Sequence, residues 1–229
     1  MKKIALLLVI TFLTFNLFVS SQTIQKSDSI SSVEKAKYLK EDLARFLSKN
    51  INYPFDALKN NIDGDVVFSF IINKNGEVDS LTMRSSPDVI LSTSALVALN
   101  LLDKKWIPAK INDRPIDKKY LIVFRYRMYL NTQPFDYKHD ALGYLNKQKY
   151  EKTLKIYNKA IKDNQYDFEL FELRSQIKGL LGDVEGSKQD FKASLKLNAD
   201  IMSVINVVAR GESRLTTRVT STRVINRTQ

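Results

Sequence analysis

The dipeptide Asn75-Gly76, which lies between two alternating apolar segments, constrains the fold of this chain more than any other feature. The apolar positions before it are two residues apart, at Val66, Phe68, Phe70 and Ile72. This is the period of a strand that is buried on at least one face. Asn and Gly both tolerate positive φ, so the pair predicts a hairpin with a type I′ turn. The returning apolar residues Val78, Leu81 and Met83 are spaced by three and then two, which predicts a β-bulge near Asp79-Ser80.

Helical patterns and a long strand surround this hairpin. Helices are predicted over residues 41–49 and 55–60, and a third follows Ser86-Pro87-Asp88, with an apolar stripe at Leu91, Ala95, Ala98, Leu99 and Leu102. A last strand alternates apolar residues at Tyr120, Ile122, Phe124, Tyr126 and Met128 with Arg125 and Arg127 on its other face. The predicted fold class is α+β, a three-stranded antiparallel sheet with two or three helices.

The N-terminus has the layout of a secretory signal peptide. Met1-Lys2-Lys3 is followed by an apolar run from Ile4 to Val19 and by compact residues before Gln22. The alternative is an uncleaved membrane anchor, although the run is shorter than the ~20 apolar residues that a spanning helix needs. We therefore expect a signal peptide over residues 1–21 and export to the periplasm. Residues 22–39 are polar and predict a flexible leader.

Charge and cysteine content exclude several classes of protein. The net charge is +11, but Lys2, Lys3 and the five Arg and one Glu of residues 201–229 account for six of it. The remaining +5 is unexceptional, so we expect no nucleic-acid partner. There is no cysteine, hence neither a disulfide nor a lipid attached to cysteine.

A second pattern begins after Pro134. At an offset of 34 residues, small residues pair with small ones and aromatic or apolar residues with each other, as in Ala160 with Ser194 and Tyr157 with Phe191. This period is typical of tetratricopeptide repeats and predicts two of them over residues 136–200. Such repeats either form a groove for a partner or only pack on the first domain. For residues 201–229 we predict a capping helix, between Asp200 and Gly211, and a basic disordered tail.

No constellation of catalytic residues is present. His139 is the only histidine and is expected at the surface of a helix, and no Gly-x-Ser-x-Gly, Walker or dinucleotide motif occurs. Asp56, Asp63 and Asp65 are read as turn and solubility residues, and Trp106 as a core residue. The sequence predicts no enzyme, metal or cofactor.

Three segments together resemble the C-terminal domain of TonB over residues 40–130. They are YPFDALKNNIDGDVVFSFIINKNGEV, KKWIPAKINDRPID and KKYLIVFRYRM. The order of the motif residues also matches that family: Tyr53, Pro54, Gly64, Gly76, Trp106 and Pro108.

The resemblance implies binding of a short peptide, the TonB box of outer-membrane transporters, as an added strand at the exposed edge of the sheet. The strand from Tyr120 to Met128 matches the strand of the family that pairs with the peptide. The implied binding residues are Asn52, Tyr120, Ile122, Phe124 and Tyr126. The implied partner is a protein or peptide, with an outer-membrane TonB-dependent receptor as candidate, and a homodimer paired through strands is left open.

The chain departs from a TonB energy transducer in two respects. About 20 residues, none of them proline in 22–40, separate the apolar segment from the domain, and ~18 extended residues reach at most ~60 Å. A repeat region also follows the domain. We therefore expect a periplasmic, non-enzymatic interaction module of the cell envelope. The alternative is an inner-membrane-anchored transducer in transport across the outer membrane, with membrane contact only if the N-terminal segment is uncleaved.

Overall fold

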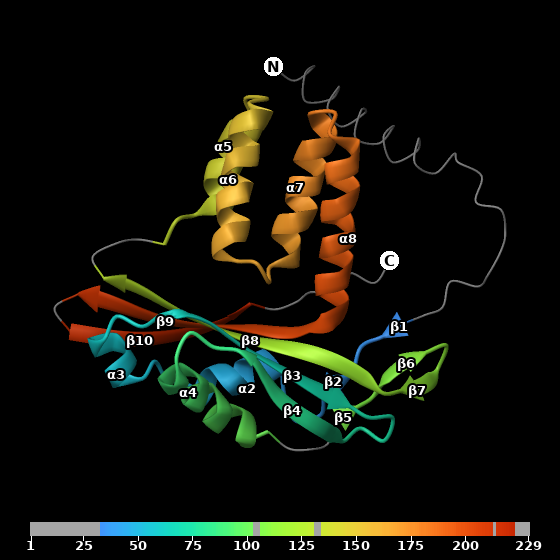
Figure 1. Cartoon of the computed structure of the whole chain (residues 1–229), viewed down its shortest axis with the longest axis vertical. Helices are drawn as coiled ribbons and strands as arrows, with labels where there is room; N and C mark the ends of the chain where they lie inside the picture. The colour runs from blue at the N-terminus through green and yellow to red at the C-terminus, as the bar shows by residue number, and fades with distance from the viewer. Residues whose placement is uncertain (1–32, 103–105, 131–133, 213, 223–229) are drawn as a thin grey trace. The chain divides into compact units, whose positions relative to one another are not determined.

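The computed structural model describes residues 33–102, 106–130, 134–212 and 214–222 (Figure 1). The predicted signal peptide and most of the predicted leader lie outside these residues. Residues 33–38, the described end of that leader, form two short strands, β1 (Val33–Glu34) and β2 (Lys37–Tyr38). The expectation of a flexible leader is therefore wrong here, because Ala36 is buried and its N–H donates to the Tyr120 hydroxyl at 2.9 Å.

A five-stranded sheet organises the chain, rather than the three-stranded sheet that was predicted. In spatial order its strands are β10 (Arg214–Thr222), β9 (Ile201–Glu212), β8 (Lys118–Leu130), β3 (Gly64–Ile72) and β4 (Val78–Ser85). The pairs β8–β3 and β3–β4 are antiparallel, as expected. The pair β8–β9 is parallel, and β10 pairs with β9 in antiparallel register.

The β3–β4 hairpin has the predicted bulge but a different turn. Ile72 pairs with Val78 and Ile71 with Ser80, so Asp79 is the extra residue. Within residues 73–76, φ is positive only at Gly76, where it is +78°. The Gly76 N–H donates to the Asn73 carbonyl at 2.9 Å, which describes an ordinary turn followed by a left-handed glycine. The type I′ prediction is wrong because only the second residue of Asn75-Gly76 takes a positive φ.

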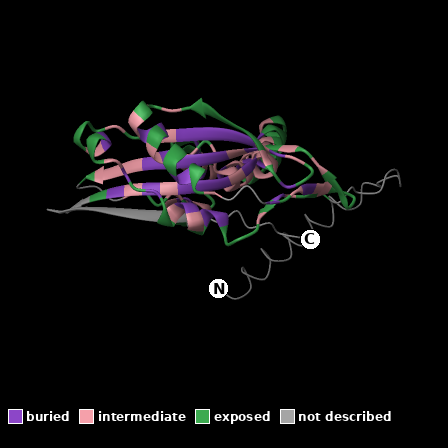
Figure 2. Cartoon of the chain, turned by 90° about the horizontal axis from the view of Figure 1, so that it is seen from below, coloured by how far each residue is buried: buried purple, intermediate pink, exposed green. Residues whose placement is uncertain are grey.

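Three helices cover one face of the sheet: α2 (Leu43–Lys49), α3 (Phe55–Lys59) and α4 (Val89–Asn100). The main core lies between them and the strands, and in Figure 2 much of the strand surface is purple while the outward faces of these helices are largely green. Trp106 is buried in this core, as predicted. Its ring centroid lies 5.0 Å from that of Tyr38 and 5.8 Å from that of Phe70. Short strands complete the rim: β5 (Trp106–Ile107), β6 (Ala109–Ile111) and β7 (Arg114–Ile116).

Four helices form the helical region, which we define as α5 (Tyr137–Leu145), α6 (Tyr150–Asp163), α7 (Phe168–Leu180) and α8 (Val184–Asp200). They make two consecutive helical hairpins. The small residues that the repeat pattern placed at helix contacts are buried: Ala141, Ala160, Ser175 and Ser194. These helices lie within residues 136–200, where two repeats were predicted, and their assignment as tetratricopeptide repeats stays a prediction. The part of the chain described here thus contains seven helices, and the fold class is α+β.

The segment after Asp200 is the main correction. Residues 201–208, predicted as a capping helix, lie in β9, and residues 214–222 of the predicted disordered tail form β10. Asp200 and Gly211 resemble helix caps, but five residues between them are β-branched: Ile201, Val204, Ile205, Val207 and Val208. Such residues favour a strand when both faces can be covered. Here α2 and the helical region provide the two covers.

A candidate strand-docking edge

The side chains predicted to bind a peptide are core anchors. Tyr120, Ile122, Phe124 and Tyr126 are each fully buried on the face of β8 that α2, α3 and α4 cover. The Tyr126 hydroxyl donates to the Leu91 carbonyl at 3.2 Å, and burial raises the pKa of Tyr126 to about 12. These side chains hold β8 in place, so any partner of β8 meets its backbone edge rather than these four groups.

That backbone edge is already occupied. Phe124 pairs with Val66 of β3 on one side and with Ile205 of β9 on the other. The expectation that residues 120–128 form an edge strand is therefore wrong for this structure. Since β9 lies far beyond β8 in the sequence, with four helices between them, no local pattern around β8 could reveal the pairing.

Asn52, the fifth residue predicted to bind a peptide, is hydrogen-bonded to α4. It is exposed, and its carbonyl accepts a hydrogen bond from the Ser94 hydroxyl of α4 at 3.0 Å. Its neighbour Tyr53 packs edge-on against Tyr126, with ring centroids 5.3 Å apart, and donates to the Ile62 carbonyl at 2.7 Å. The Tyr-Pro motif thus orders the α2–α3 connection, and Pro54 is the N-cap of α3.

Gly64 and Gly76 of the motif have positive φ, and neighbouring atoms approach both of them closely. Gly64 has φ +137°, and a Cβ there would lie 2.9 Å from Pro87 Cγ. At Gly76 a Cβ would lie 2.0 Å from the Trp106 carbonyl oxygen and 3.6 Å from Pro108 Cδ. The predicted structural motif therefore brings Gly76, Trp106 and Pro108 together at the end of the sheet.

Strand β9, which occupies this edge, packs against apolar residues on both of its faces. Ile205, Val207 and Ala209 face the main core. Ile201 and Val204 face the opposite side of the sheet, which we call the outer face, and pack with Val67 and Val123. Leu197 of α8 and Tyr166 of the α6–α7 connection complete this small cluster. A strand on β8 is therefore held by alternating apolar contacts on both faces as well as by main-chain pairing.

A charged cluster, which the sequence analysis missed, lies on the outer face. Arg127 Nη2 is 2.8 Å and Arg125 Nε 3.5 Å from Asp65 Oδ1. Burial lowers the pKa of Arg125, and the charge of Asp65 opposes that change. Arg127 Nη2 also donates to the Asp163 carbonyl at the end of α6, at 3.0 Å. The alternation that put Arg125 and Arg127 on one face of β8 was a signal for this cluster, whereas Asp65 was read as a turn residue.

A cavity of about 530 Å³ lies where the outer face meets the helical region. Its walls include Arg125 and Tyr129 of β8, Asn206 and Arg210 of β9, and Asn164 and Asp167 of the α6–α7 connection. Burial raises the pKa of Asp167. His139 lies elsewhere, exposed on α5 as predicted, and no cluster of metal-ligating side chains occurs among the residues that the structure describes.

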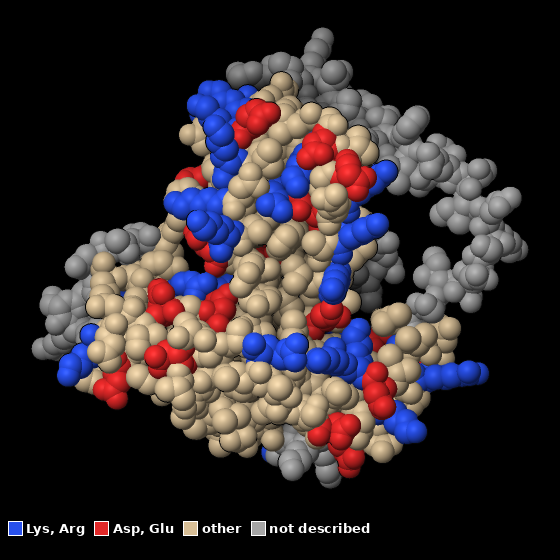
Figure 3. Space-filling view, in the orientation of Figure 1, with Lys and Arg blue, Asp and Glu red and all other residues tan. Residues whose placement is uncertain are grey.

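Charged side chains on the visible surface are mixed in sign. Figure 3 shows Lys and Arg beside Asp and Glu over the helical region and the sheet. Lys138 and Glu169 form an exposed ion pair of the helical region, with 2.6 Å between Nζ and Oε2.

Residues 49–128 match a family model described as Gram-negative bacterial TonB protein C-terminal. The match starts at the last residue of α2 and ends inside β8, so the helical region, β9 and β10 lie outside it. It confirms the resemblance for these 80 residues. Domains of this family are periplasmic, non-enzymatic and interact with other proteins such as outer-membrane receptors. No curated protein matches the chain. Within the described ranges, every helix is too short or too polar to cross a bilayer.

Proposed function

We propose that this chain is an exported, non-enzymatic protein-interaction module that binds an extended segment of a partner as a strand alongside β8. One observation carries the proposal: β9, which lies outside the matched segment, is added to β8 as a parallel strand. It supports a role of β8 as a strand acceptor, filled here by the chain itself. Partner candidates include a segment of an outer-membrane TonB-dependent receptor.

The register of β9 supports the kind of segment that would fit. Main-chain pairing runs from Leu121 with Ile201 to Leu130 with Gly211. Strand addition gains affinity from these main-chain hydrogen bonds, and alternate side chains supply specificity. Core-facing positions hold Ile205, Val207 and Ala209, so a partner needs apolar side chains of decreasing size at every second residue.

Strand complementation tests this proposal. A chain that ends at Asp200 is mixed with a labelled peptide of residues 201–212, IMSVINVVARGE. We expect saturable binding by fluorescence anisotropy and a rise in melting temperature, because the peptide restores the missing strand and its buried side chains. A peptide with Val207→Pro is the matched control, since proline cannot donate to the ladder. Equal binding of both peptides, or of neither, contradicts the proposal.

The helical region is proposed as a second interaction surface. Apolar side chains at its surface are about half exposed: Leu142, Leu180, Val184, Phe191 and Leu195. Phe191 and Leu195 are four residues apart on α8, the spacing of neighbours on one helix face. Exposed apolar groups of this kind favour contact with a protein partner.

Periplasmic location by cleavage after residue 21 remains our proposal, with an inner-membrane-anchored transducer as the alternative. The two differ in the N-terminal segment, which lies outside the described residues. The intact mass of the protein from the cell envelope distinguishes them, because only a cleaved chain begins at Gln22.

A further inference from the structure

We infer that β9 is a tethered competitor for the β8 edge, and that the helical region controls its release. The inference rests on the proposed function, because it describes the regulation of that same edge. A partner strand and β9 need the same backbone groups of β8, from Leu121 to Leu130. Binding of a partner must therefore be coupled to displacement of β9.

The first step is the direct connection between α8 and β9. Helix α8 ends at Asp200, and its C-cap Ile201 is already the first residue of β9. No loop separates the helix from the strand. A shift of α8 is therefore transmitted to β9, and β9 cannot leave β8 without moving the end of α8.

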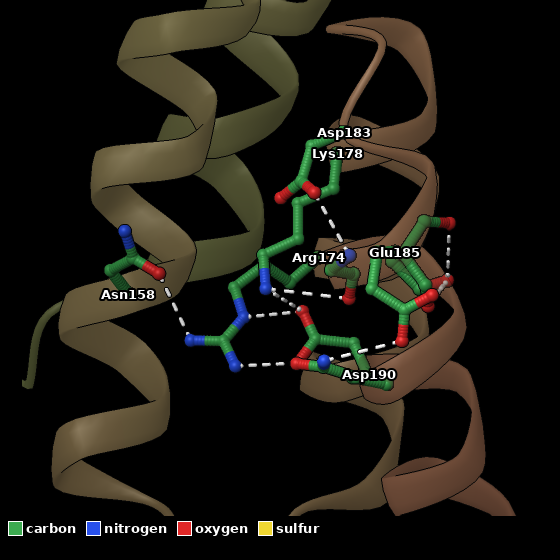
Figure 4. A network of polar contacts seen from close by, with 10 residues as sticks. Asn158, Arg174, Lys178, Asp183, Glu185 and Asp190 are labelled. Atoms are coloured by element: carbon green, nitrogen blue, oxygen red, sulfur yellow. Dashed lines mark hydrogen bonds and ion pairs between the residues drawn. The ribbon is translucent and has the colours of Figure 1, made fainter.

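The second step is the attachment of α8 to α7. Asp190 of α8 accepts hydrogen bonds from Arg174 at 2.7 and 2.6 Å and lies 2.9 Å from Lys178 Nζ (Figure 4). Asn158 of α6 accepts from Arg174 at 2.9 Å, so three helices share the network. Burial raises the pKa of Asp190, but the two cations lower it more. Removal of one partner from such a buried pair leaves the other charge uncompensated and loosens the packing of the helices that carry them.

The third step is the attachment of the helical region to the sheet. Arg127 of β8 joins Asp65 to the carbonyl of Asp163 at the end of α6. Near the α8–β9 junction, Lys35 Nζ lies 3.4 Å from both Asn198 Oδ1 and the Ile201 carbonyl. These polar contacts surround a small apolar cluster, to which the helical region contributes Tyr166 and Leu197. The helices therefore hold β9 through a limited set of contacts that a second partner could alter.

The exchange conserves most contacts, which makes it feasible. Removing β9 exposes Ile205 and Val207, but an incoming strand with similar side chains covers the same surface. A free partner must then compete only with the tethering of β9, which keeps β9 at a high effective concentration beside β8. For short linkers this effective concentration is in the millimolar range. Loosening the helical region reduces that advantage and should strengthen binding of a partner.

A reversible disulfide tests the competition. Tyr129 and Arg210 are paired across β8 and β9, both line the cavity, and the natural chain contains no cysteine. Paired strands lie about 4.8 Å apart, within the span of a disulfide. The full chain with Tyr129→Cys and Arg210→Cys is titrated with the labelled 201–212 peptide, oxidised and then reduced. We expect binding only after reduction, and the cysteine-free chain serves as the control for the reductant.

The outcomes separate the two proposals. Equal binding to the oxidised and reduced forms overturns the competition by β9. Absence of binding in both forms and in the chain that ends at Asp200, with the helical content of that chain retained by circular dichroism, overturns the proposed function itself. Binding to the truncated and reduced chains, with none to the oxidised chain, supports both.

Substitutions in the network test the control by the helical region. Asp190→Ala should tighten peptide binding about tenfold, in the usual range of coupling between sites. Lys178→Ala, which leaves Arg174 paired with Asp190, should do so to a smaller extent and guards against unfolding of the first variant. Gln189→Ala removes only an exposed contact to Glu185 on the same helix and should leave the affinity unchanged. Unchanged affinity in both Asp190→Ala and Lys178→Ala, with helical content retained by circular dichroism, overturns the role of the helices.

Discussion

At the scale of single residues, Asp65 compensates two guanidinium groups on the outer face of the sheet. Its side chain is 10% exposed, and that of Arg125 is 8% exposed. Asp65 Oδ1 and Arg125 Nε have no well-aligned hydrogen-bond partner, so the attraction between them is mainly one of charge. In a buried site, this attraction offsets a large cost of desolvation only while both signs are present.

Replacement of Asp65 by Asn should therefore lower the free energy of unfolding by about 3 kcal/mol, because it leaves two arginines uncompensated. Urea denaturation of the two chains measures the difference. Asp56→Asn is the matched control, since Asp56 is an exposed acidic residue in the first turn of α3 and its loss should change the free energy by less than about 0.5 kcal/mol. A similar small change for both variants would show that Asp65 does not stabilise the arginine pair.

At the scale of elements, the turn between β3 and β4 depends on one glycine. Gly76→Ala should lower the free energy of unfolding by roughly 3 kcal/mol, since both the backbone strain at φ +78° and the approach of Trp106 oppose a Cβ. Gly143→Ala is the natural control, because Gly143 lies within α5 and a Cβ there meets nothing within 4 Å. That change should stabilise the chain by about 0.5–1 kcal/mol. Thermal denaturation of both variants gives the comparison.

Local sequence signals predict some of these elements but not others. Strands β3 and β8 and helices α2, α3 and α4 follow from local periodicity and from capping residues, and the match at 49–128 agrees with them. Strand β9 could not be predicted in this way, because its apolar residues occur on both faces. Alternation of one polar and one apolar face is then absent, and a short apolar run fits a helix or a strand equally well.

The docking edge could be predicted only in part, for a different reason. The sequence identified β8 and the core side chains Tyr120, Ile122, Phe124 and Tyr126. Whether the second edge of β8 is open depends on a segment far along the chain, and hydrogen bonding between distant strands leaves no mark in either segment alone. That β9 occupies the second edge of β8 therefore follows only from the three-dimensional structure.

At the scale of the whole described chain, β9 belongs to two cores at once. Ile205 and Val207 lie in the main core with α2, whereas Ile201 and Val204 lie in the outer-face cluster with Leu197 of α8. Because the strand continues directly from α8, unfolding of the sheet should remove an anchor of the helices. The sheet and the helical region should then unfold together.

Two probes can follow this coupling separately. Trp106 is the only tryptophan and reports on the main core, while circular dichroism at 222 nm is dominated by the helices, most of which belong to the helical region. We expect coincident transitions in urea, as two-state unfolding requires. Ile205→Ala should move both midpoints equally, with a loss of about 3 kcal/mol from the cavity that it creates. If the tryptophan transition moved and the circular-dichroism transition did not, β9 would not join the two regions, and displacement of β9 by a partner could not be communicated to the helices.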